Sequence, residues 1–178
     1  MNHYFPNMFK PIQIGTVTVP NRFVVPPMGN NFANTDGSMS DRSAAYYEGR
    51  AKGGFGLITL ESTVVYKEAK GGPRKPCLFD DAVIPSFKAV ADRCHAYGAK
   101  VSIQLQHAGP EGNSKLTGYP LKAASAIAPS AGREIPEAMP TEEVYRLIEC
   151  YGDAARRAQL AGIDMVEVHC AHGYLVST

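Results

Sequence analysis

Two histidines and a tyrosine stand close together near the end of the printed sequence, at His169, His172 and Tyr174. An imidazole N–H can donate a hydrogen bond to a carbonyl oxygen, and a phenol can donate a proton to a carbon atom. The three residues follow a short β-rich run at 165–168 and flank Gly173, so a strand that ends in a turn would project them into one cleft. The pattern therefore predicts an acid–base cluster at a strand end.

Each of these side chains also has a structural interpretation. A single strand histidine such as His169 is usually a core residue, and only the addition of His172 and Tyr174 favours a chemical role. The spacing would suit two metal ligands, but the sequence places no third ligand beside them, so no metal site is predicted. Tyr174 could instead cap the rim of a domain.

Composition favours a small-molecule partner. The chain has 178 residues and a formal net charge of +1, and 44% of its residues are hydrophobic, which is enough material for a substantial core. No basic stripe is present that would neutralise the phosphates of a nucleic acid, and no polybasic cluster accompanies an amphipathic stretch that would bind a membrane. We therefore expect neither nucleic acid nor membrane as a partner.

The cysteines and the N-terminal residues indicate a compartment. Cys77, Cys94, Cys150 and Cys170 are far apart and form no Cys-x-x-Cys pair, so neither a disulfide framework nor a zinc site is expected. Residues 1–10 lack an apolar signal core, and no run approaches the roughly 18 apolar residues of a spanning helix. A cytoplasmic location is the expectation.

Strand and helix signals alternate along the chain. Alternating apolar and polar residues on both sides of Gly15 and Thr16 predict a β-hairpin at 9–20. Apolar runs and helix-capping residues then predict strands near 23–27, 57–61, 100–106 and 165–169, and helices at 41–52 with Ser40 as N-cap, at 83–97, and from the cap Thr141 to just before Gly162. The segment 107–140 is predicted to be a long functional loop that faces the substrate.

This order is typical of an α/β fold with a parallel sheet and right-handed crossovers. An open doubly wound sheet usually carries a Gly-x-Gly-x-x-Gly turn after its first strand, but here that turn is Pro27-Met28-Gly29-Asn30-Asn31. Polar residues follow every strand instead, which favours a (β/α)8 TIM barrel. Because a full barrel takes about 250 residues, we interpret 1–178 as the N-terminal portion of one such domain, with about four strands and three helices.

In a barrel, the carboxyl ends of the strands form one mouth. Gly29, Ser62, Gln104 and the His169 cluster would meet there. This set can hold a flat polar heterocycle and donate hydrogen bonds to an oxygen atom. Structural interpretations remain open, because Gln104 could bond a neighbouring strand, Pro27 and Met28 could simply end a strand, and Glu61 could be a structural carboxylate.

The chain resembles the Old Yellow Enzyme family of FMN-dependent ene-reductases in four segments that occur in the family's order. They are NRFVVPPM at 21–28, RAKGGFGLI at 50–58, QLQHAG at 104–109 and VEVHCAHGYL at 166–175. The resemblance covers nearly the whole chain but only the first half of the family's barrel. It implies FMN as cofactor and NAD(P)H as reductant.

The resemblance also implies roles for individual residues. Pro27, Met28 and Gly29 match a turn whose backbone lies against the flavin ring, Ser62 matches a small residue whose amide approaches a flavin carbonyl, and Gln104 matches the glutamine that binds the pyrimidine edge. His169 and His172 match the pair that binds the oxygen of an α,β-unsaturated substrate. Tyr174 matches the proton donor.

Two positions depart from the family pattern, and the chain stops early. Gly29 stands where relatives often carry Cys or Thr, and Pro110 stands where many carry Arg. The phosphate sites of such barrels usually follow strands 7 and 8, which this half does not contain. One alternative is therefore a catalytically inert half-barrel that forms a homo-oligomer or pairs with a missing C-terminal half. Another is a different class of FMN- or phosphate-binding barrel.

Overall fold

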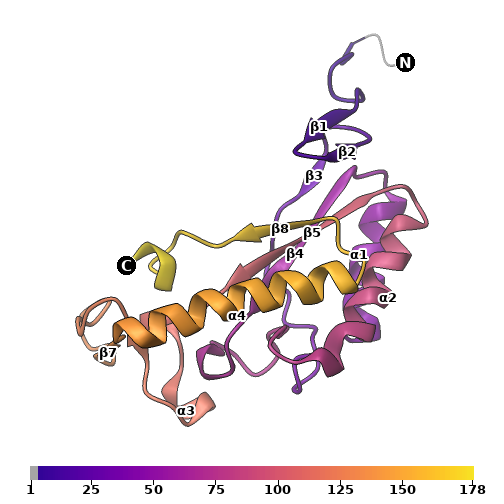
Figure 1. Cartoon of the computed structure of the whole chain (residues 1–178). Helices are drawn as coiled ribbons and strands as arrows, with labels where there is room; N and C mark the ends of the chain where they lie inside the picture. The colour runs from indigo at the N-terminus through magenta and orange to yellow at the C-terminus, as the bar shows by residue number, and fades with distance from the viewer. Residues whose placement is uncertain (1–3) are drawn as a thin grey trace.

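A four-stranded parallel sheet forms the centre of the protein in the computed structural model, which describes residues 4–178 (Figure 1). Its strands lie in the order β3 (Val24–Val25), β4 (Leu57–Val64), β5 (Lys100–Gln106) and β8 (Met165–Val168). Every strand pairs in parallel with the next one along the chain that belongs to this sheet. The predicted parallel α/β architecture is confirmed.

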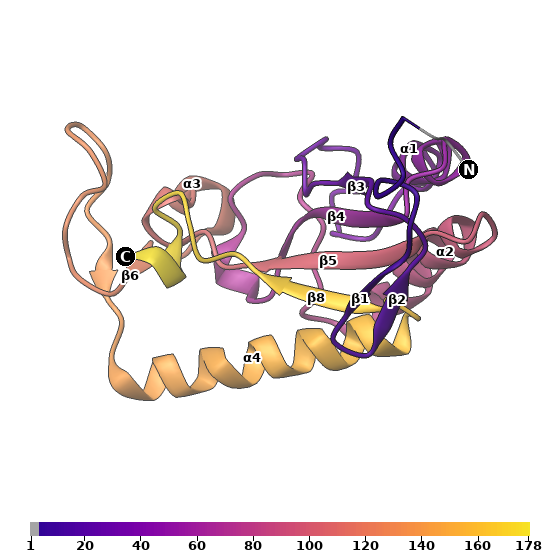
Figure 2. The same ribbon diagram turned by 90° about the horizontal axis from the view of Figure 1, so that it is seen from above.

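Three long helices connect these strands. They are α1 (Asp41–Lys52), α2 (Ile84–His95) and α4 (Thr141–Leu160). Figure 2 shows α4 running along β8 at one edge of the molecule, with α1 and α2 together beside the starts of β4 and β5. None of the helices within residues 4–178 is long and apolar enough to cross a membrane. Of the N-terminal stretch at 1–10, residues 1–3 lie outside the described range.

The predicted hairpin is formed by β1 (Ile12–Ile14) and β2 (Val17–Val19), which pair antiparallel around Gly15. Gly15 has φ of 56°, a conformation that glycine adopts without steric cost. The segment after the hairpin lies at the start of β4, because the Gly56 N–H donates to the Phe23 carbonyl over 3.0 Å. The hairpin therefore projects from the amino-end edge of the sheet, away from the carboxyl ends of its strands (Figure 1).

A side-chain cap explains the start of α1 but not that of α4. Ser40 caps α1 as predicted, since its Oγ accepts the Ser43 N–H over 3.1 Å. Helix α2 ends at His95, before the predicted position 97, and Gly98 follows with φ of 78°. The prediction that Thr141 is an N-cap is wrong, because Pro140 holds that position and Thr141 is the first helical residue. Its two following glutamates still lie in the first turn, where the helix dipole favours them.

The segment predicted as a loop at 107–140 contains short elements of its own. These are a 3-10 helix, η3 (Gly109–Glu111), the one-turn helix α3 (Ser114–Thr117), and β6 (Lys122–Ala123), which pairs in parallel with β7 (Glu137–Ala138). Asn113 caps α3, because its Oδ1 accepts the Leu116 N–H. Three further 3-10 helices are η1 (Lys67–Ala69), η2 (Asp81–Val83) and η4 (Leu175–Ser177).

The two faces of the sheet differ in chemistry. The hydrophobic core lies on the helix side and includes Val101, Ile103 and Leu105 from alternate positions of β5. The residues between them, Ser102 and Gln104, are buried but polar. Alternation along a strand sends successive side chains to opposite faces, so β5 presents its polar side chains on the face away from the helices. The strands are thus less uniformly apolar than strands that are buried between hydrophobic layers on both faces of a sheet.

Candidate active site

Parallel pairing brings the ends of all four strands to one edge of the sheet. Gly29 follows β3, and Ser62 lies near the carboxyl end of β4. Gln104 lies in β5, and His169 directly follows β8. Gln104 and Glu167 are partners in register, and the His169 N–H donates to the Leu105 carbonyl over 3.0 Å. The predicted site residues therefore share the carboxyl-end edge.

The three aromatic side chains at this edge are in contact. The ring of His169 lies 5.2 Å from that of His172 and 4.8 Å from that of Tyr174, both in edge-to-face orientation. His169 is buried, His172 is exposed and Tyr174 is half-buried. The tertiary structure thus places His169 between the other two, with His172 and Tyr174 nearer to solvent.

Hydrogen bonds indicate the protonation of His169. Burial, together with the neighbouring His172, lowers the pKa of His169, while Glu167 opposes the shift. The ring is therefore neutral near pH 7. Its Nδ1 accepts the Ala171 N–H over 3.3 Å, so we assign the ring proton to Nε2. That atom lies 3.4 Å from Nδ1 of His172, a long contact that another acceptor can replace.

The backbone around Tyr174 is held by a turn from β5. The Leu175 N–H donates to the His107 carbonyl over 3.3 Å, and Leu175 is buried. Gly109 has φ of 60°, and a Cβ built on it would lie 2.6 Å from the Leu175 nitrogen. Only glycine fits this approach. The segment after Tyr174 therefore packs against the turn that follows His107. Sequence reasoning did not identify this contact.

His107 itself serves as a packing residue of this turn. Burial lowers the pKa of His107 to about 4, so its ring is neutral at pH 7. Nδ1 accepts the Gly109 N–H over 3.0 Å, and the ring stacks on Tyr66 at 5.7 Å. Its Nε2 is buried and has no hydrogen-bond partner among the described residues. His107 is therefore a buried residue that supports this turn from within.

A second network ties the turn after β3 to the end of β4. The Asn30 N–H donates to Oε2 of Glu61 over 3.2 Å, while the Asn30 side chain donates to the Tyr47 hydroxyl over 3.3 Å. The same hydroxyl accepts the Glu61 N–H over 2.9 Å. The side chain of Glu61 is completely buried, and burial raises its pKa against the opposing charge of Lys75. The structural interpretation of Glu61 as a carboxylate that binds a neighbouring loop is therefore correct.

A β-bulge shapes β4 at the same place. The pairing with β5 runs in register to Leu60 and resumes at Thr63, so Glu61 and Ser62 fall in an irregular step. Bulges near sheet ends redirect side chains and leave a residue outside the regular ladder. Ser62 lies in this step, at the edge that carries the aromatic cluster.

Lys75 and Glu167 were not singled out from the sequence. Lys75 lies 3.3 Å from Ser62 Oγ and lines a cavity of about 70 Å3 together with Tyr174, Gln106 and other residues. Gln104 donates its amide to Oε1 of Glu167 over 2.5 Å. Strand register could have identified Glu167, because it pairs with Gln104, whereas Lys75 comes from a loop and carries no such signal.

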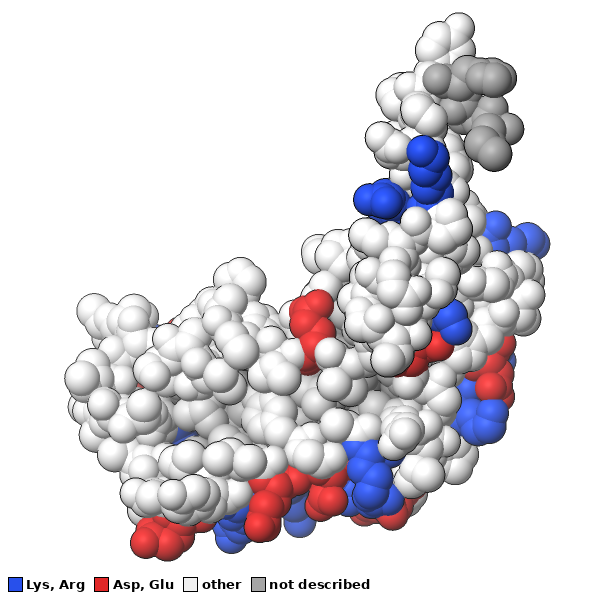
Figure 3. Space-filling view, turned by 45° about the horizontal axis from the view of Figure 1, so that its top comes forward, with Lys and Arg blue, Asp and Glu red and all other residues white. Residues whose placement is uncertain are grey.

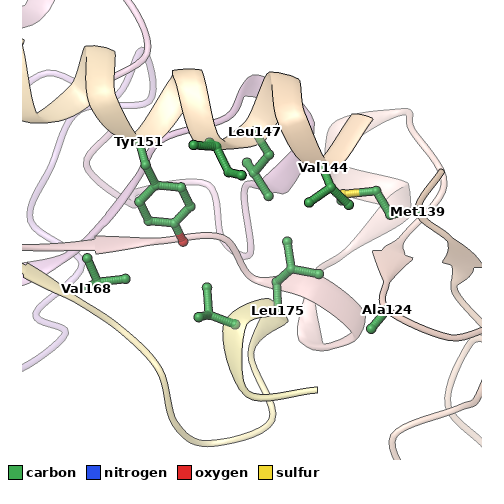
Figure 4. A pocket seen from close by; sticks show the side chains of 9 residues that line it. Ala124, Met139, Val144, Leu147, Tyr151, Val168 and Leu175 are labelled. Atoms are coloured by element: carbon green, nitrogen blue, oxygen red, sulfur yellow. The ribbon is translucent and has the colours of Figure 1, made fainter. Parts of the chain in front are cut away.

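A larger, apolar pocket lies elsewhere. Its volume is about 590 Å3, and it opens between α4, the end of β8 and η4 (Figure 4). Its lining is almost entirely apolar and consists of Ala124, Met139, Val144, Leu147, Ile148, Tyr151, Val168, Leu175 and Val176. The residues of α4 that line this pocket are only partly covered, since Val144 and Ile148 are 41% and 61% exposed. This pocket lies on the helix side of β8 and offers no acid–base group apart from Tyr151, whose pKa burial raises to about 12.

Charged side chains are few in the hollow of the molecule. Figure 3 shows a hollowed face with few charges between the hairpin and the opposite lobe, while Lys, Arg, Asp and Glu gather along the outer rim. Within residues 4–178, no group of three or more His, Cys, Asp or Glu side chains is arranged to hold a metal ion. Besides aromatic, amide and hydroxyl groups, the site contains the Lys75–Glu61 ion pair and the carboxylate of Glu167.

Comparison with known proteins places these features in a family. The model of the NADH:flavin oxidoreductase / NADH oxidase family matches residues 7–178. The chain is 40% identical over 175 residues to an NADH oxidase of Thermoanaerobacter brockii, covering 97% of this chain and 27% of that protein. It is 36% identical over 170 residues to an NADPH dehydrogenase of Listeria welshimeri, covering 95% of this chain and 49% of the relative.

Solved structures agree with this result. The chain is similar to Old Yellow Enzyme from Pichia sp. AKU4542, with a TM-score of 0.87, 33% identity, and coverage of 96% of this chain and 47% of the other. It is similar to morphinone reductase with a TM-score of 0.89, 29% identity, and coverage of 98% and 50%. The chain thus spans about half the length of these proteins, and its sheet and helices correspond to part of their TIM barrel.

Proposed function

Since the chain belongs to the NADH:flavin oxidoreductase / NADH oxidase family, we propose that it is the N-terminal half of an FMN-dependent oxidoreductase. The proposed reaction reduces the activated C=C bond of an α,β-unsaturated carbonyl compound with NAD(P)H as electron donor. The observation that carries the proposal is the contact between His169, His172 and Tyr174 at the carboxyl-end edge of the sheet. In a TIM barrel that edge holds the active site.

The residues at this edge fit a flat heterocycle with several carbonyl and nitrogen atoms. Met28 and Gly29 are exposed there, and Ser62 lies in a β-bulge beside a buried carboxylate oxygen, Glu61 Oε1, that has no partner within residues 4–178. We assign the backbone of Pro27, Met28 and Gly29, the amide of Ser62 and the side chain of Gln104 to holding FMN. Gln104 would then share its amide between Glu167 and the cofactor.

When bound, FMN would supply the hydride chemistry that links NAD(P)H to the β-carbon of the alkene. The chain's own residues prepare the substrate for this transfer. Nε2–H of His169 and an N–H of His172 donate hydrogen bonds to the substrate oxygen and stabilise the negative charge that develops on it. For this, the oxygen replaces the 3.4 Å contact between the two rings.

Tyr174 then supplies the proton that completes the reduction. Its hydroxyl donates the proton to the α-carbon, while the edge-to-face contact with His169 and the bond from Leu175 to His107 hold the side chain in place. The half-buried position of Tyr174 leaves it open to re-protonation from solvent.

The test uses two proteins: the 178-residue chain alone, and the same chain joined to the C-terminal half of the Listeria welshimeri relative. We expect the joined protein to bind FMN, seen in its visible spectrum, and to reduce a simple enone with NAD(P)H. A variant with His169, His172 and Tyr174 all replaced should bind FMN but lose enone reduction. Wild-type rates in that variant would contradict the proposed roles, and absence of FMN from every form would contradict the flavin proposal.

A second candidate concerns the chain alone: it is catalytically inert and associates with itself or with a second half-barrel. The supporting observation is the open edge at β8, where Val166 and Val168 are 46% and 47% exposed beside the large apolar pocket. Uncovered strand edges and apolar surface drive association. Stoichiometric FMN on a monomer of the 178-residue chain would refute this candidate.

We further propose a cytoplasmic location and a small-molecule partner. The support for the compartment is that Cys77, Cys94, Cys150 and Cys170 are all free thiols. The support for the partner is the near-neutral charge, which offers no surface for a nucleic acid.

A further inference from the structure

Lys75 lies between two of the residues assigned to the cofactor. Its Nζ is 3.3 Å from Ser62 Oγ, and a Cβ built on Gly29 would lie 3.1 Å from the same nitrogen. The ammonium group therefore fills the space that a side chain at position 29 would need. It also lines the small cavity that Tyr174 borders.

Glu61 holds Lys75 in this place. Oε2 of Glu61 lies 3.8 Å from Lys75 Nζ, and the side chains are 0% and 24% exposed, respectively. A completely buried carboxylate is costly without a compensating cation, and Lys75 is the only cation within ion-pair distance among the described residues. Loss of Lys75 would leave that charge without compensation.

The same carboxylate connects Lys75 to the turn after β3. Oε2 of Glu61 also accepts the Asn30 N–H, while Oε1 has no partner in the described part of the chain. The ammonium of Lys75 donates a hydrogen bond to Ser62 Oγ and lies at ion-pair distance from Glu61. One ion pair thus fixes the position of Gly29, Ser62 and a positive charge relative to each other.

We propose that Lys75, held by Glu61, is a positioning residue that places a positive charge beside the flavin and favours its reduced form. The inference rests on the proposed function. A neutral flavin ring that accepts a hydride from NAD(P)H gains two electrons and one proton, and therefore gains one negative charge. A fixed cation in a partly buried site stabilises that charge more than it stabilises the neutral oxidised ring.

The two members of the pair should act in opposite directions. Lys75→Met removes a positive charge and shifts the FMN midpoint potential to more negative values, so that reduced FMN is bound at least about tenfold more weakly relative to oxidised FMN. Glu61→Gln removes a negative charge and shifts the potential to more positive values. Structural damage to the site would instead shift the FMN midpoint potential of both variants in the same direction.

The experiment measures the FMN midpoint potential, the FMN dissociation constant and the melting temperature in the flavin-binding form of the protein. Lys75→Arg should keep the wild-type potential because it retains the charge. The double variant Glu61→Gln with Lys75→Met should melt above Lys75→Met, because no buried charge is left unpaired, and its potential should stay below that of the wild type. Lys88→Met, which removes an exposed lysine paired with Asp92 on α2, is the matched control and should change nothing.

The result that overturns the inference is an unchanged midpoint potential in Lys75→Met while wild-type protein binds FMN. Shifts of equal sign in Lys75→Met and Glu61→Gln would overturn it as well, because they would assign the pair a structural role only. Failure of the proposed function is distinct from both, since it requires that the wild-type protein binds no FMN in any form.

Discussion

Two carboxylates at opposite edges of the sheet differ in how completely they are hydrogen-bonded. At the amino-end edge, Asp164 accepts hydrogen bonds at 2.7 Å from His95 Nε2 and at 2.9 Å from both Lys100 Nζ and the Val101 N–H. At the carboxyl-end edge, Glu61 has a cation at 3.8 Å and one oxygen without a partner in the described chain. The first group is fully satisfied and the second is not.

The pKa values follow the same contrast. Burial disfavours the charged form of Asp164, but hydrogen bonds from Val101, Lys100 and His95 outweigh it and lower the pKa of Asp164. For Glu61, burial dominates and raises the pKa. A fully satisfied carboxylate stabilises the fold, whereas incomplete hydrogen bonding and a raised pKa are more typical of groups near a functional site. This contrast supports the proposal that the amino-end edge stabilises the fold and the carboxyl-end edge holds the active site, as in TIM barrels generally.

The largest expected effect is on catalysis at the carboxyl-end edge. Tyr174→Phe removes the proposed proton donor and keeps the ring that contacts His169, so enone turnover should fall by about 10²- to 10⁴-fold with little change in melting temperature. Steady-state rates with and without the hydroxyl give the comparison. Tyr145→Phe, on the exposed surface of α4, is the control. Undiminished turnover in Tyr174→Phe would assign protonation to another group.

Gly109→Ala should lower both the stability of the fold and the catalytic rate. The new Cβ would collide with the Leu175 backbone, which we expect to cost about 2–4 kcal/mol in stability and to displace Tyr174. Gly162→Ala is the matched control, because Gly162 has φ of 76° and no atom near its Cβ position. It should cost only about 1 kcal/mol through backbone strain. Equal losses in the two variants, measured by urea unfolding, would show that the approach to Leu175 is not needed.

The opposite result is expected at the amino-end edge. Asp164→Asn weakens the hydrogen bonds that His95 and Lys100 make to a charged group, so the free energy of unfolding should fall by about 1.5–3 kcal/mol. FMN binding and enone turnover should be unaffected. A variant with normal stability and impaired FMN binding would reverse the assignment of the two edges.

The pH dependence of stability sharpens this prediction. Because the folded pKa of Asp164 lies below its unfolded value of about 3.9, its contribution is fully present above that pH. The contribution is lost as the pH falls through the folded pKa. Wild type should therefore lose more stability than Asp164→Asn as the pH falls from the unfolded value of about 3.9 through the lower folded pKa. Parallel urea unfolding curves over this range would contradict the assignment.

The smallest effect is expected in the apolar pocket. Ile148→Ser replaces a side chain that is 61% exposed, so the stability of the monomer should change by no more than about 0.5 kcal/mol. Association of the 178-residue chain should nevertheless weaken, as sedimentation velocity would report. Glu149→Gln, on the same helix but outside the pocket, is the control. Unaltered association in Ile148→Ser would place the contact surface elsewhere.

Local signals explain which elements could be predicted. Ser40 caps α1 and glycines follow α1 and α2 because these features depend on a few neighbouring residues, and the strands at β4, β5 and β8 have the apolar runs that the sequence displays. The cap at Thr141 failed because Pro140 already has the extended backbone of an N-cap, which moves Thr141 into the first turn. The end of α2 lies at His95, two residues before the predicted end.

The sequence by itself determined the order of strands and helices and the grouping of His169, His172 and Tyr174, since neighbours along a chain remain neighbours in space. Only the tertiary structure decided which distant groups meet them. Lys75 reaches Ser62 and Glu61 from a loop, and Leu175 rests on Gly109. Such contacts depend on strand register and chain crossovers, which bring together residues whose spacing in the sequence carries no periodic signal.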